Sequence, residues 1–245
     1  MGEKLSAAAA LADANVAAGV LALRPDYRAL LLVAEGLEPG PSDGVSEELL
    51  ARAEAATAGL LAAGPVEELP HIAAWREAYR AFGAKPQRTR NSLEALTRRA
   101  AAGLPRINRL TDLYNAISVL HQVPIGGEDL DGYVGAPRLV QALGSEAFDT
   151  VADGVSVIEH PEVGEVVWCD AAGVTCRRWN WRQGRRTALR EGTTRALFIL
   201  DALAPVSDDD LAAAGAELAV SLRRLGPGVR VSERLIAGAW DSGPA

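Results

Sequence analysis

Apolar residues recur along much of the first half of the chain at the spacing of a helix. In residues 107–121 they fall at steps of three and four, which places them on one face: Ile107, Leu110, Leu113, Ile117 and Leu120. Ser46 precedes another apolar stretch as a helix cap, and Gly64 follows it as a stop. Helices are therefore predicted over 5–20, 46–64, 67–82, about 92–103, 107–121 and 208–226.

Short apolar runs bounded by turn residues predict strands, most of them in the second half. Residues 162–181 read as two strands joined at Asp170–Gly173. Further strands are predicted at 27–37, at 193–203 and at 228–236, and the glycine-rich residues 123–135 are predicted to form a turn. Helices first, strands later and one helix near the end predict an α+β fold.

Charge is distributed unevenly along the chain. Residues 76–110 carry a local charge of +7 and residues 176–195 carry +6. Because the net charge of the chain is −7, the remaining 190 residues together carry −20. Local potential attracts a polyanion, and this pattern is typical of a nucleic-acid partner. The alternative is that these arginines are scattered around solvated helices. The acidic remainder argues against tight non-specific binding, and no DNA partner is expected.

Other features narrow the classes of function. No apolar run reaches the roughly 18 residues of a membrane helix, and the N-terminal residues lack the pattern of a signal peptide, so a cytoplasmic protein without a membrane partner is expected. The three histidines and two cysteines have no metal-ligand spacing, and no metal or cofactor is expected. Cys176 is interpreted as a thiol buried in a strand. With no GxSxG, Walker A or GxGxxG motif, an enzyme of this sequence would position water and substrate through amide, arginine and backbone groups.

The segment CRRWNWRQGRR, residues 176–186, holds two of the five tryptophans and five arginines. In a strand, alternation would place Arg178, Asn180 and Arg182 on one face. Arg177, Trp179 and Trp181 would then share the other. We therefore interpret the segment as a cleft strand, with a tryptophan in the core or pocket wall and Asn180 and Arg182 facing an ester or phosphate.

Polar residues also share a face of the helix predicted over 107–121. Asn108, Asp112 and Asn115 are spaced by four and three residues, and such residues are poor helix formers. Their row indicates either the wall of a site or a hydrogen-bonded structural network, and the pattern alone does not choose between them.

Residues 107–131, INRLTDLYNAISVLHQVPIGGEDLD, resemble the segment N-x-V-V-D-x-T-N-Y-V…G-Q-P-L-H-A-F-D of the B3/B4 domain in the beta subunit of bacterial phenylalanyl-tRNA synthetase, which hydrolyses mischarged tyrosyl-tRNA. Asn108, Asp112, Asn115, Pro124 and Asp129 match in register. Residues 75–99 and CRRWNWRQ are similar to free-standing members of that family. The resemblance implies a B3/B4-type fold with a mixed or antiparallel sheet, packed helices and a central cleft, in one domain over 1–245 with its motifs in about 75–203.

The resemblance also implies roles for individual residues. Asn115 matches the pocket asparagine, whereas Gly126 stands where the synthetase has a histidine. REGTTRALFILDA is similar to S-E-x-T-x-x-V-L-L-E, which implies Glu191 and Thr194 near the pocket. We therefore expect three catalytic residues, Asn115, Asp129 and Glu191. The expected substrate pocket is Asn108, Asp112, Gly126, Trp179, Asn180, Arg182 and Thr194, and the expected tRNA contacts are Arg76, Arg80, Lys85, Arg88 and Arg178.

The function implied by this resemblance is hydrolysis of a mischarged aminoacyl-tRNA ester in trans, with the acceptor end of tRNA as partner. Two alternatives stay open. One is a tRNA- or RNA-binding module without turnover, and the other is a pocket that binds a free amino acid or another small metabolite. The missing histidine at Gly126 favours the alternatives, and the Trp-Asn-Trp-Arg cluster favours a retained, specific pocket.

Overall fold

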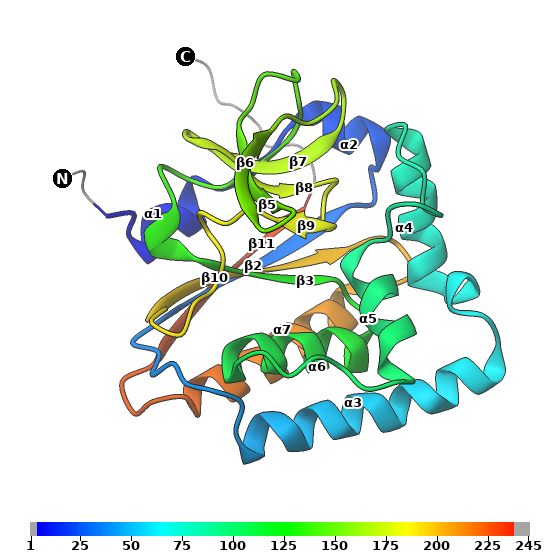
Figure 1. The fold of residues 1–245 in the computed structure, drawn as a ribbon, viewed down its shortest axis with the longest axis vertical. Helices are drawn as coiled ribbons and strands as arrows, with labels where there is room; N and C mark the ends of the chain where they lie inside the picture. Colours follow the sequence, from blue (N-terminus) through cyan, green and yellow to red (C-terminus); the bar gives the residue numbers. More distant parts are fainter. Residues whose placement is uncertain (1–3, 238–245) are drawn as a thin grey trace.

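The computed structural model describes residues 4–237, and two β-sheets packed against each other form its centre (Figure 1). The first sheet is antiparallel throughout, in the order β11-β2-β10-β3. The second has the order β1-β4-β7-β8-β9, with a parallel pair only between β1 and β4. Helices and a mixed set of strand pairings confirm the predicted α+β class.

The central strands of the first sheet are covered on both faces. Residues 29–34 of β2 are all buried, as are residues 196–202 of β10, which is why both read as continuous apolar runs. Alternate side chains enter different cores, since Leu30 and Leu32 join one cluster while Leu31 and Val33 join another. The strands of this sheet are β2 (Arg28–Glu35), β3 (Ile125–Asp129), β10 (Arg195–Ala202) and β11 (Arg230–Ala237).

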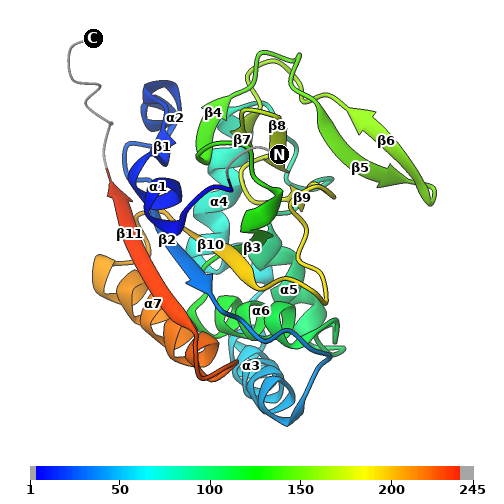
Figure 2. The ribbon, with the colours of Figure 1, turned by 90° about the vertical axis from the view of Figure 1, so that its left-hand side faces the viewer.

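A layer of helices covers one face of this sheet (Figure 1). These helices are α3 (Gly44–Ala63), α6 (Arg109–His121) and α7 (Asp208–Arg223). The other face packs against the second sheet and against shorter helices (Figure 2). These elements are α1 (Ala7–Ala12), β1 (Asn15–Val16), α2 (Ala18–Leu23), α4 (Pro70–Ala81), β4 (Arg138–Gln141), β7 (Val166–Asp170), β8 (Gly173–Arg177) and β9 (Arg182–Gln183).

The remaining elements lie at the margins. The hairpin of β5 (Phe148–Ala152) and β6 (Val155–Glu159) projects away from the two sheets (Figure 2). Helix α5 (Ser92–Ala100) lies beside α6, and single 3₁₀ turns occur at Val66–Glu68 and Leu130–Gly132. None of the helices within residues 4–237 is long and apolar enough to cross a membrane.

Several predicted boundaries needed correction. The prediction of one helix over 5–20 is wrong, because β1 separates α1 from α2 by pairing with β4. Helix α3 begins at Gly44, and Asp43 is its cap. Ser46 instead closes a capping box, in which its hydroxyl accepts a hydrogen bond from the Asp43 backbone N–H at 3.0 Å.

The turn predicted over 123–135 contains strand β3. Its two glycines suit a strand here because neighbouring side chains approach the backbone closely. A Cβ on Gly127 would lie 2.8 Å from a ring carbon of Tyr114 and 3.0 Å from one of Phe198. Pairing with β10 therefore overrides the low strand preference of glycine.

The prediction of a continuous strand through residues 176–186 is also wrong. Strand β8 ends at Arg177, and Arg178 and Trp179 have φ angles of 48° and 68°, in the left-handed region that side chains seldom adopt. A tight turn closes through Asn180 and Trp181 before β9 begins at Arg182. Alternation of faces therefore does not apply across residues 178–181.

Candidate functional site

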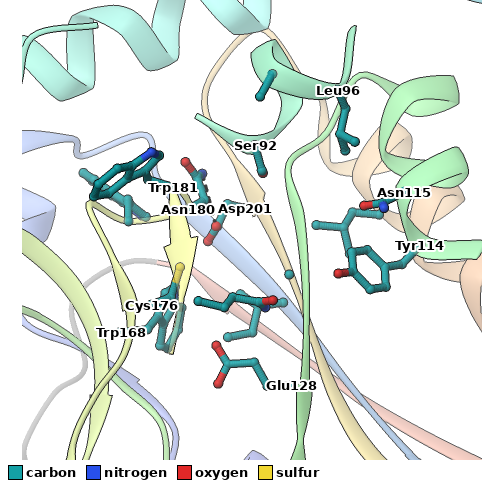
Figure 3. Close-up of a pocket in the computed structure, with 16 residues that line it drawn as sticks. Ser92, Leu96, Tyr114, Asn115, Glu128, Trp168, Cys176, Asn180, Trp181 and Asp201 are labelled. Carbon is teal, nitrogen blue, oxygen red and sulfur yellow. Dashed lines mark hydrogen bonds between the residues drawn. The ribbon is translucent and has the colours of Figure 1, made fainter. Parts of the chain in front are cut away.

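A pocket opens where edge strand β3 and the end of β10 meet the β8–β9 turn, under helices α5 and α6 (Figure 3). Its volume is about 260 Å³, somewhat below the roughly 300–1,000 Å³ of sites for drug-sized ligands. The walls are largely aromatic and aliphatic, with Trp168, Trp179, Trp181, Leu96 and Ile199 among them. A group the size of one amino acid suits this space.

The acid residues of the pocket come from two neighbouring strands of one sheet. Glu128 lies on β3 and Asp201 on β10, and their side chains are 1% and 2% exposed. Burial removes water from both carboxyls and raises the pKa of each to about 7, from ordinary values of 4.5 and 3.8. Near neutral pH each carboxyl is therefore partly protonated and partly ionised.

Asp201 is held by a chain of buried polar groups. Its Oδ1 accepts a hydrogen bond from the Tyr27 hydroxyl at 2.5 Å, and its Oδ2 accepts one from Nδ2 of Asn180 at 3.2 Å. Asn180 in turn accepts a hydrogen bond from the Tyr79 hydroxyl at 3.0 Å. Its backbone carbonyl accepts one from the N–H of Ser92, which begins α5. Asn180 thus lines the pocket, but its side-chain amide is already hydrogen-bonded to Asp201 and to Tyr79.

Asn115 reaches the pocket from α6, next to Tyr114 (Figure 3). It is 7% exposed, and its side-chain amide makes no hydrogen bond with the other residues of the described range 4–237. A buried amide of this kind can offer both a donor and an acceptor to a bound group.

The β8–β9 turn forms the opposite wall. Its left-handed residues direct Trp179 into the core, where the indole contacts Tyr27 and Trp75 edge to face at 5.0 and 5.3 Å. Trp181 stays half-buried at the mouth, with the Arg178 guanidinium 4.5 Å from its ring centre. The two tryptophans therefore have different surroundings, in place of the shared face predicted from the sequence.

Cys176, on β8, also lines the pocket, but it is a poor nucleophile. Burial raises its thiol pKa well above the ordinary value, and the nearby Glu128 and Asp201 carboxyls add to that rise. The neighbouring Arg177 does not oppose it, because its guanidinium is bound to Glu165 at 2.8 Å through two nitrogens. The interpretation as a thiol buried in a strand agrees with this environment.

A second hollow, lined by arginines, adjoins the pocket at its mouth. It shares Trp181 and Ala95 with the pocket, and its other lining residues are Arg88, Arg90 and Arg98. Arg88 and Arg90 are exposed. An acidic, mostly apolar pocket therefore has a cationic rim on this side.

A family model with the description "B3/4 domain" matches residues 74–213, more than half of the chain. The chain belongs to the B3/4 domain family. Of the solved structures, it is similar to an N-terminal fragment of the phenylalanyl-tRNA synthetase beta-subunit from Pyrococcus horikoshii, with 11% identity and a TM-score of 0.45. That match covers 91% of this chain and 53% of the other, so the chain spans about half the length of the fragment. A search of curated proteins found no match.

Four residues that the sequence assigned to the site of this B3/4 domain do line the pocket: Asn115, Gly126, Trp179 and Asn180. Gly126 occupies the position of the histidine in the resembling segment. A Cβ there would lie 3.1 Å from Nε2 of Gln183, which donates a hydrogen bond to the Gly127 carbonyl at 3.0 Å. Gln183 thus occupies the space that a longer side chain at Gly126 would need.

Asn108 and Asp112 lie outside the pocket and organise the start of α6. Asn108 is the helix cap and accepts a hydrogen bond from the Thr111 N–H at 2.9 Å. Asp112 accepts one from the Ile107 N–H at 2.8 Å and one from the Ser42 hydroxyl. Both alternatives for this polar row therefore apply. Asn108 and Asp112 belong to a hydrogen-bonded structural network, and Asn115 belongs to the wall of the pocket.

Four further expected site residues also lie outside the pocket lining. Asp129 points to the face of β3 opposite Glu128 and accepts a hydrogen bond from the Thr193 hydroxyl at 2.7 Å. Glu191 and Thr194 are exposed. Arg182 turns toward the β5–β6 hairpin, where it donates hydrogen bonds to Thr150 and Glu159. None of these four side chains lines the pocket, and their expected contact with a bound group stays a prediction.

The expected tRNA contacts divide by exposure. Arg80, Lys85 and Arg88 are exposed and form no ion pair within residues 4–237. Arg76 is 13% exposed and binds both oxygens of the buried Glu94, at 2.8 and 3.0 Å. Arg178 is half-buried and bonds to Thr89 and Glu165. Only the first group has free charge to offer a phosphate.

The sequence reasoning missed Glu128 and Asp201. A usable signal existed for Asp201, which is the single charge in the apolar run ALFILDAL. An acid inside a strand that is otherwise apolar needs a buried partner or a function. Within the described part of the chain, no group of three or more histidines, cysteines or acids is arranged to hold a metal ion.

Proposed function

We propose that this B3/4 domain is a free-standing editing factor that hydrolyses the ester of a mischarged aminoacyl-tRNA in trans. The observation that carries the proposal is the junction of the two hollows at Trp181. One has room for a single aminoacyl group, and the other offers the arginines that phosphates require. Family membership and the resemblance of residues 107–131 to an editing domain support the same reaction.

In this mechanism the aminoacyl group enters the pocket while an acceptor-end phosphate rests on Arg88, the one lining arginine of the second hollow without an ion pair among residues 4–237. The Asn115 amide donates a hydrogen bond to the ester carbonyl, where negative charge develops. A positioned water attacks the carbonyl carbon, the ester C–O bond breaks, and the ribose oxygen leaves with a proton from that water. Binding and orientation supply most of the rate, because Cys176 is protonated and the Ser92 hydroxyl, which also lines the pocket, has no hydrogen-bonded base among residues 4–237 to activate it.

The proposal includes several wider expectations. The partner is the acceptor end of tRNA, the reaction takes place in the cytoplasm, and it uses neither a metal nor another cofactor. Residues 1–245 act as one domain, although residues 1–3 and 238–245 lie outside the described residues. Asp129 then acts indirectly, because it bonds to the Thr193 hydroxyl ahead of β10. Glu191 and Thr194 are exposed and would contact the tRNA outside the pocket.

One observation favours the alternatives, namely a binding module without turnover or a pocket for a free amino acid. Two of the three residues expected to be catalytic, Asp129 and Glu191, lie outside the pocket lining. A pocket that has lost those contacts can keep its affinity for a ligand while hydrolysing nothing.

A panel of mischarged tRNAs separates these functions. The purified protein is incubated with tRNAs carrying different amino acids, and release of the amino acid is followed. We expect release from at least one member of the panel. No release from a full panel, with tRNA still bound, would exclude the editing function and leave the binding module. Absent or salt-independent tRNA binding would exclude that module too and leave the small-molecule pocket.

A further inference from the structure

Glu128 has one carboxylate oxygen that accepts no hydrogen bond of normal geometry from residues 4–237. Its Oε2 accepts a hydrogen bond from the Tyr133 hydroxyl at 2.5 Å. Its Oε1 has no hydrogen-bond partner among residues 4–237, although the side chain is 1% exposed and lines the pocket. The hydroxyls of Thr175 and Thr187 lie beside the same carboxyl and lower its pKa, although neither makes a hydrogen bond of normal geometry to it. A buried carboxylate oxygen without a donor is costly unless a ligand supplies one.

The groups around Glu128 leave its charge uncompensated. Strand β8 brings Cys176, helix α6 brings Tyr114, and strand β10 brings the second acid, Asp201. Arg186 is the cation among the described residues that acts most on it, and its guanidinium is already bound to both oxygens of Asp170, at 2.7 and 2.8 Å. No lysine, arginine or histidine lines the pocket. Its interior therefore has a negative potential.

We propose that Glu128 binds a primary ammonium group of the ligand, so that the pocket selects amines attached to an apolar body. The inference rests on the proposed function, in which the ammonium belongs to an aminoacyl group. Both oxygens of Asp201 are taken by Tyr27 and Asn180, so Asp201 adds to the field while Glu128 makes the contact. Trp168 and Trp179 line the pocket, and indole rings attract a nearby cation, while Leu96 and Ile199 would contact the apolar part.

Two sources of this ammonium share the same chemistry. It is either the α-ammonium that every aminoacyl group has, or the side-chain ammonium of a basic amino acid. Three stable probes distinguish them without requiring hydrolysis. Leucinol has only an α-type amine, Nα-acetyl-lysinamide has only a side-chain amine, and N-acetyl-leucinol has no ammonium.

Binding is measured by titration calorimetry at pH 7 in buffers of different ionisation enthalpy. The Glu128 carboxyl is about half protonated at that pH, since its pKa is about 7. An ammonium bound beside it lowers this pKa, so binding releases about half a proton per ligand and affinity rises between pH 6 and pH 8. We expect leucinol or Nα-acetyl-lysinamide, or both, to bind with proton release, and N-acetyl-leucinol to bind at least tenfold more weakly.

Two variants connect the effect to the residue. Glu128→Gln keeps an acceptor for Tyr133 and is expected to lose at least tenfold in amine affinity together with the proton release. Glu77→Gln, an exposed acid on α4, is the matched control and should change neither. The inference is overturned if N-acetyl-leucinol binds as tightly as the amines, if neither amine binds, or if Glu128→Gln retains wild-type affinity. The proton release is read on the wild-type protein, so it remains decisive if a variant does not fold.

The outcome is separable from that of the proposed function. Amine binding with proton release, but no release of amino acid from any tRNA, would support the inference and exclude the editing function. Hydrolysis of a mischarged tRNA with no dependence on Glu128 or on the amine would support the function and overturn the inference.

Discussion

Glu128 and Asp129 are neighbours in the chain, and the pleat of β3 sends them to opposite sides. Glu128 faces the second sheet and the pocket, and Asp129 faces Thr193. A shift of one residue in a strand exchanges every side chain between its two faces. The register of β3 therefore places Glu128 in the pocket lining and Asp129 outside it.

Glu128 makes a prediction about stability and pH. The pKa of its carboxyl is raised from 4.5 to about 7 in the folded protein. As the pH rises, the unfolded chain therefore loses this proton before the folded protein does. The stability that the protonated carboxyl contributes is fully present below pH 4.5 and is lost between pH 4.5 and pH 7. A difference of about 2.5 pKa units corresponds to about 3 kcal/mol. Relative to wild type, Glu128→Gln should gain up to that amount in free energy of unfolding at pH 8 and little at pH 4.5. Urea titrations at both pH values measure it, and equal gains at both would contradict the assignment.

Asn115 and Asn108 form a matched pair on one helix. Asn115→Ala should lower the rate of deacylation roughly a hundredfold, because it removes a donor to the developing oxyanion, with tRNA affinity unchanged. Asn108→Ala removes the helix cap, and should cost about 1 kcal/mol of stability and leave turnover intact. Single-turnover kinetics, tRNA binding and thermal melting report the three quantities. Equal losses of binding and turnover in Asn115→Ala would refute its role.

At the scale of elements, an ion-pair network joins α4 to α5. The carboxylate of Glu94 is fully buried and binds Arg76 from α4 and Arg98 from α5. A buried acid that loses a partner destabilises the fold strongly, since its charge stays out of water. Arg76 is therefore a structural residue, although the sequence placed it among the tRNA contacts.

Arg76 and Arg80, one turn apart on α4, test this difference. Arg76→Ala should lower the free energy of unfolding by about 2 kcal/mol, because Arg98 still pairs with Glu94. Arg80→Ala should leave stability unchanged, since Arg80 is exposed and makes no ion pair within the described residues. If phosphate binding uses Arg80, only the second variant loses tRNA affinity at a temperature where both are folded. Chemical denaturation and filter binding provide the comparison.

Much of the fold could be predicted from the sequence, and the parts that could not be predicted have physical reasons. The helices at 46–64 and 208–226 and the strands at 27–37 and 193–203 have periodicity or apolar runs that packing reinforces. Strand β3 was missed because its glycine at 127 is required by the close packing of Tyr114 and Phe198 against the backbone, which the local sequence does not reveal. The 178–181 turn was missed because two residues take left-handed backbone conformations that no local pattern announced.

At the scale of the whole molecule, the two cationic stretches of the sequence have different fates. In residues 176–195 six of the seven arginines pair with acids from elsewhere in the chain, including Arg177 with Glu165 and Arg186 with Asp170. In residues 76–110 the exposed Arg80, Lys85, Arg88 and Arg99 have no such partner within residues 4–237. Long-range attraction for a polyanion therefore resides mainly in the first stretch.

This division makes a prediction about salt. The double variant Lys85→Ala, Arg88→Ala should weaken tRNA binding and reduce the slope of log K against log salt by about 1–2. Arg223→Ala, Arg224→Ala removes the same charge from the end of α7, in the helical layer away from the pocket, and is the control (Figure 1). Binding measured between 50 and 200 mM salt gives both slopes. Identical slopes for the two variants would place the RNA elsewhere.

The acidic interior and basic rim of the pocket also bear on how a reaction cycle would end. An aminoacyl ester enters with an ammonium group and no carboxylate, so nothing on it opposes Glu128 or Asp201. In the proposed reaction hydrolysis would create a carboxylate at the former ester, in a pocket lined by two acids and joined to a hollow lined by Arg88 and Arg90. The newly formed amino acid is then repelled from the floor and drawn outward. Product would leave because of the charge that the reaction itself generates, and free amino acids would be weak inhibitors.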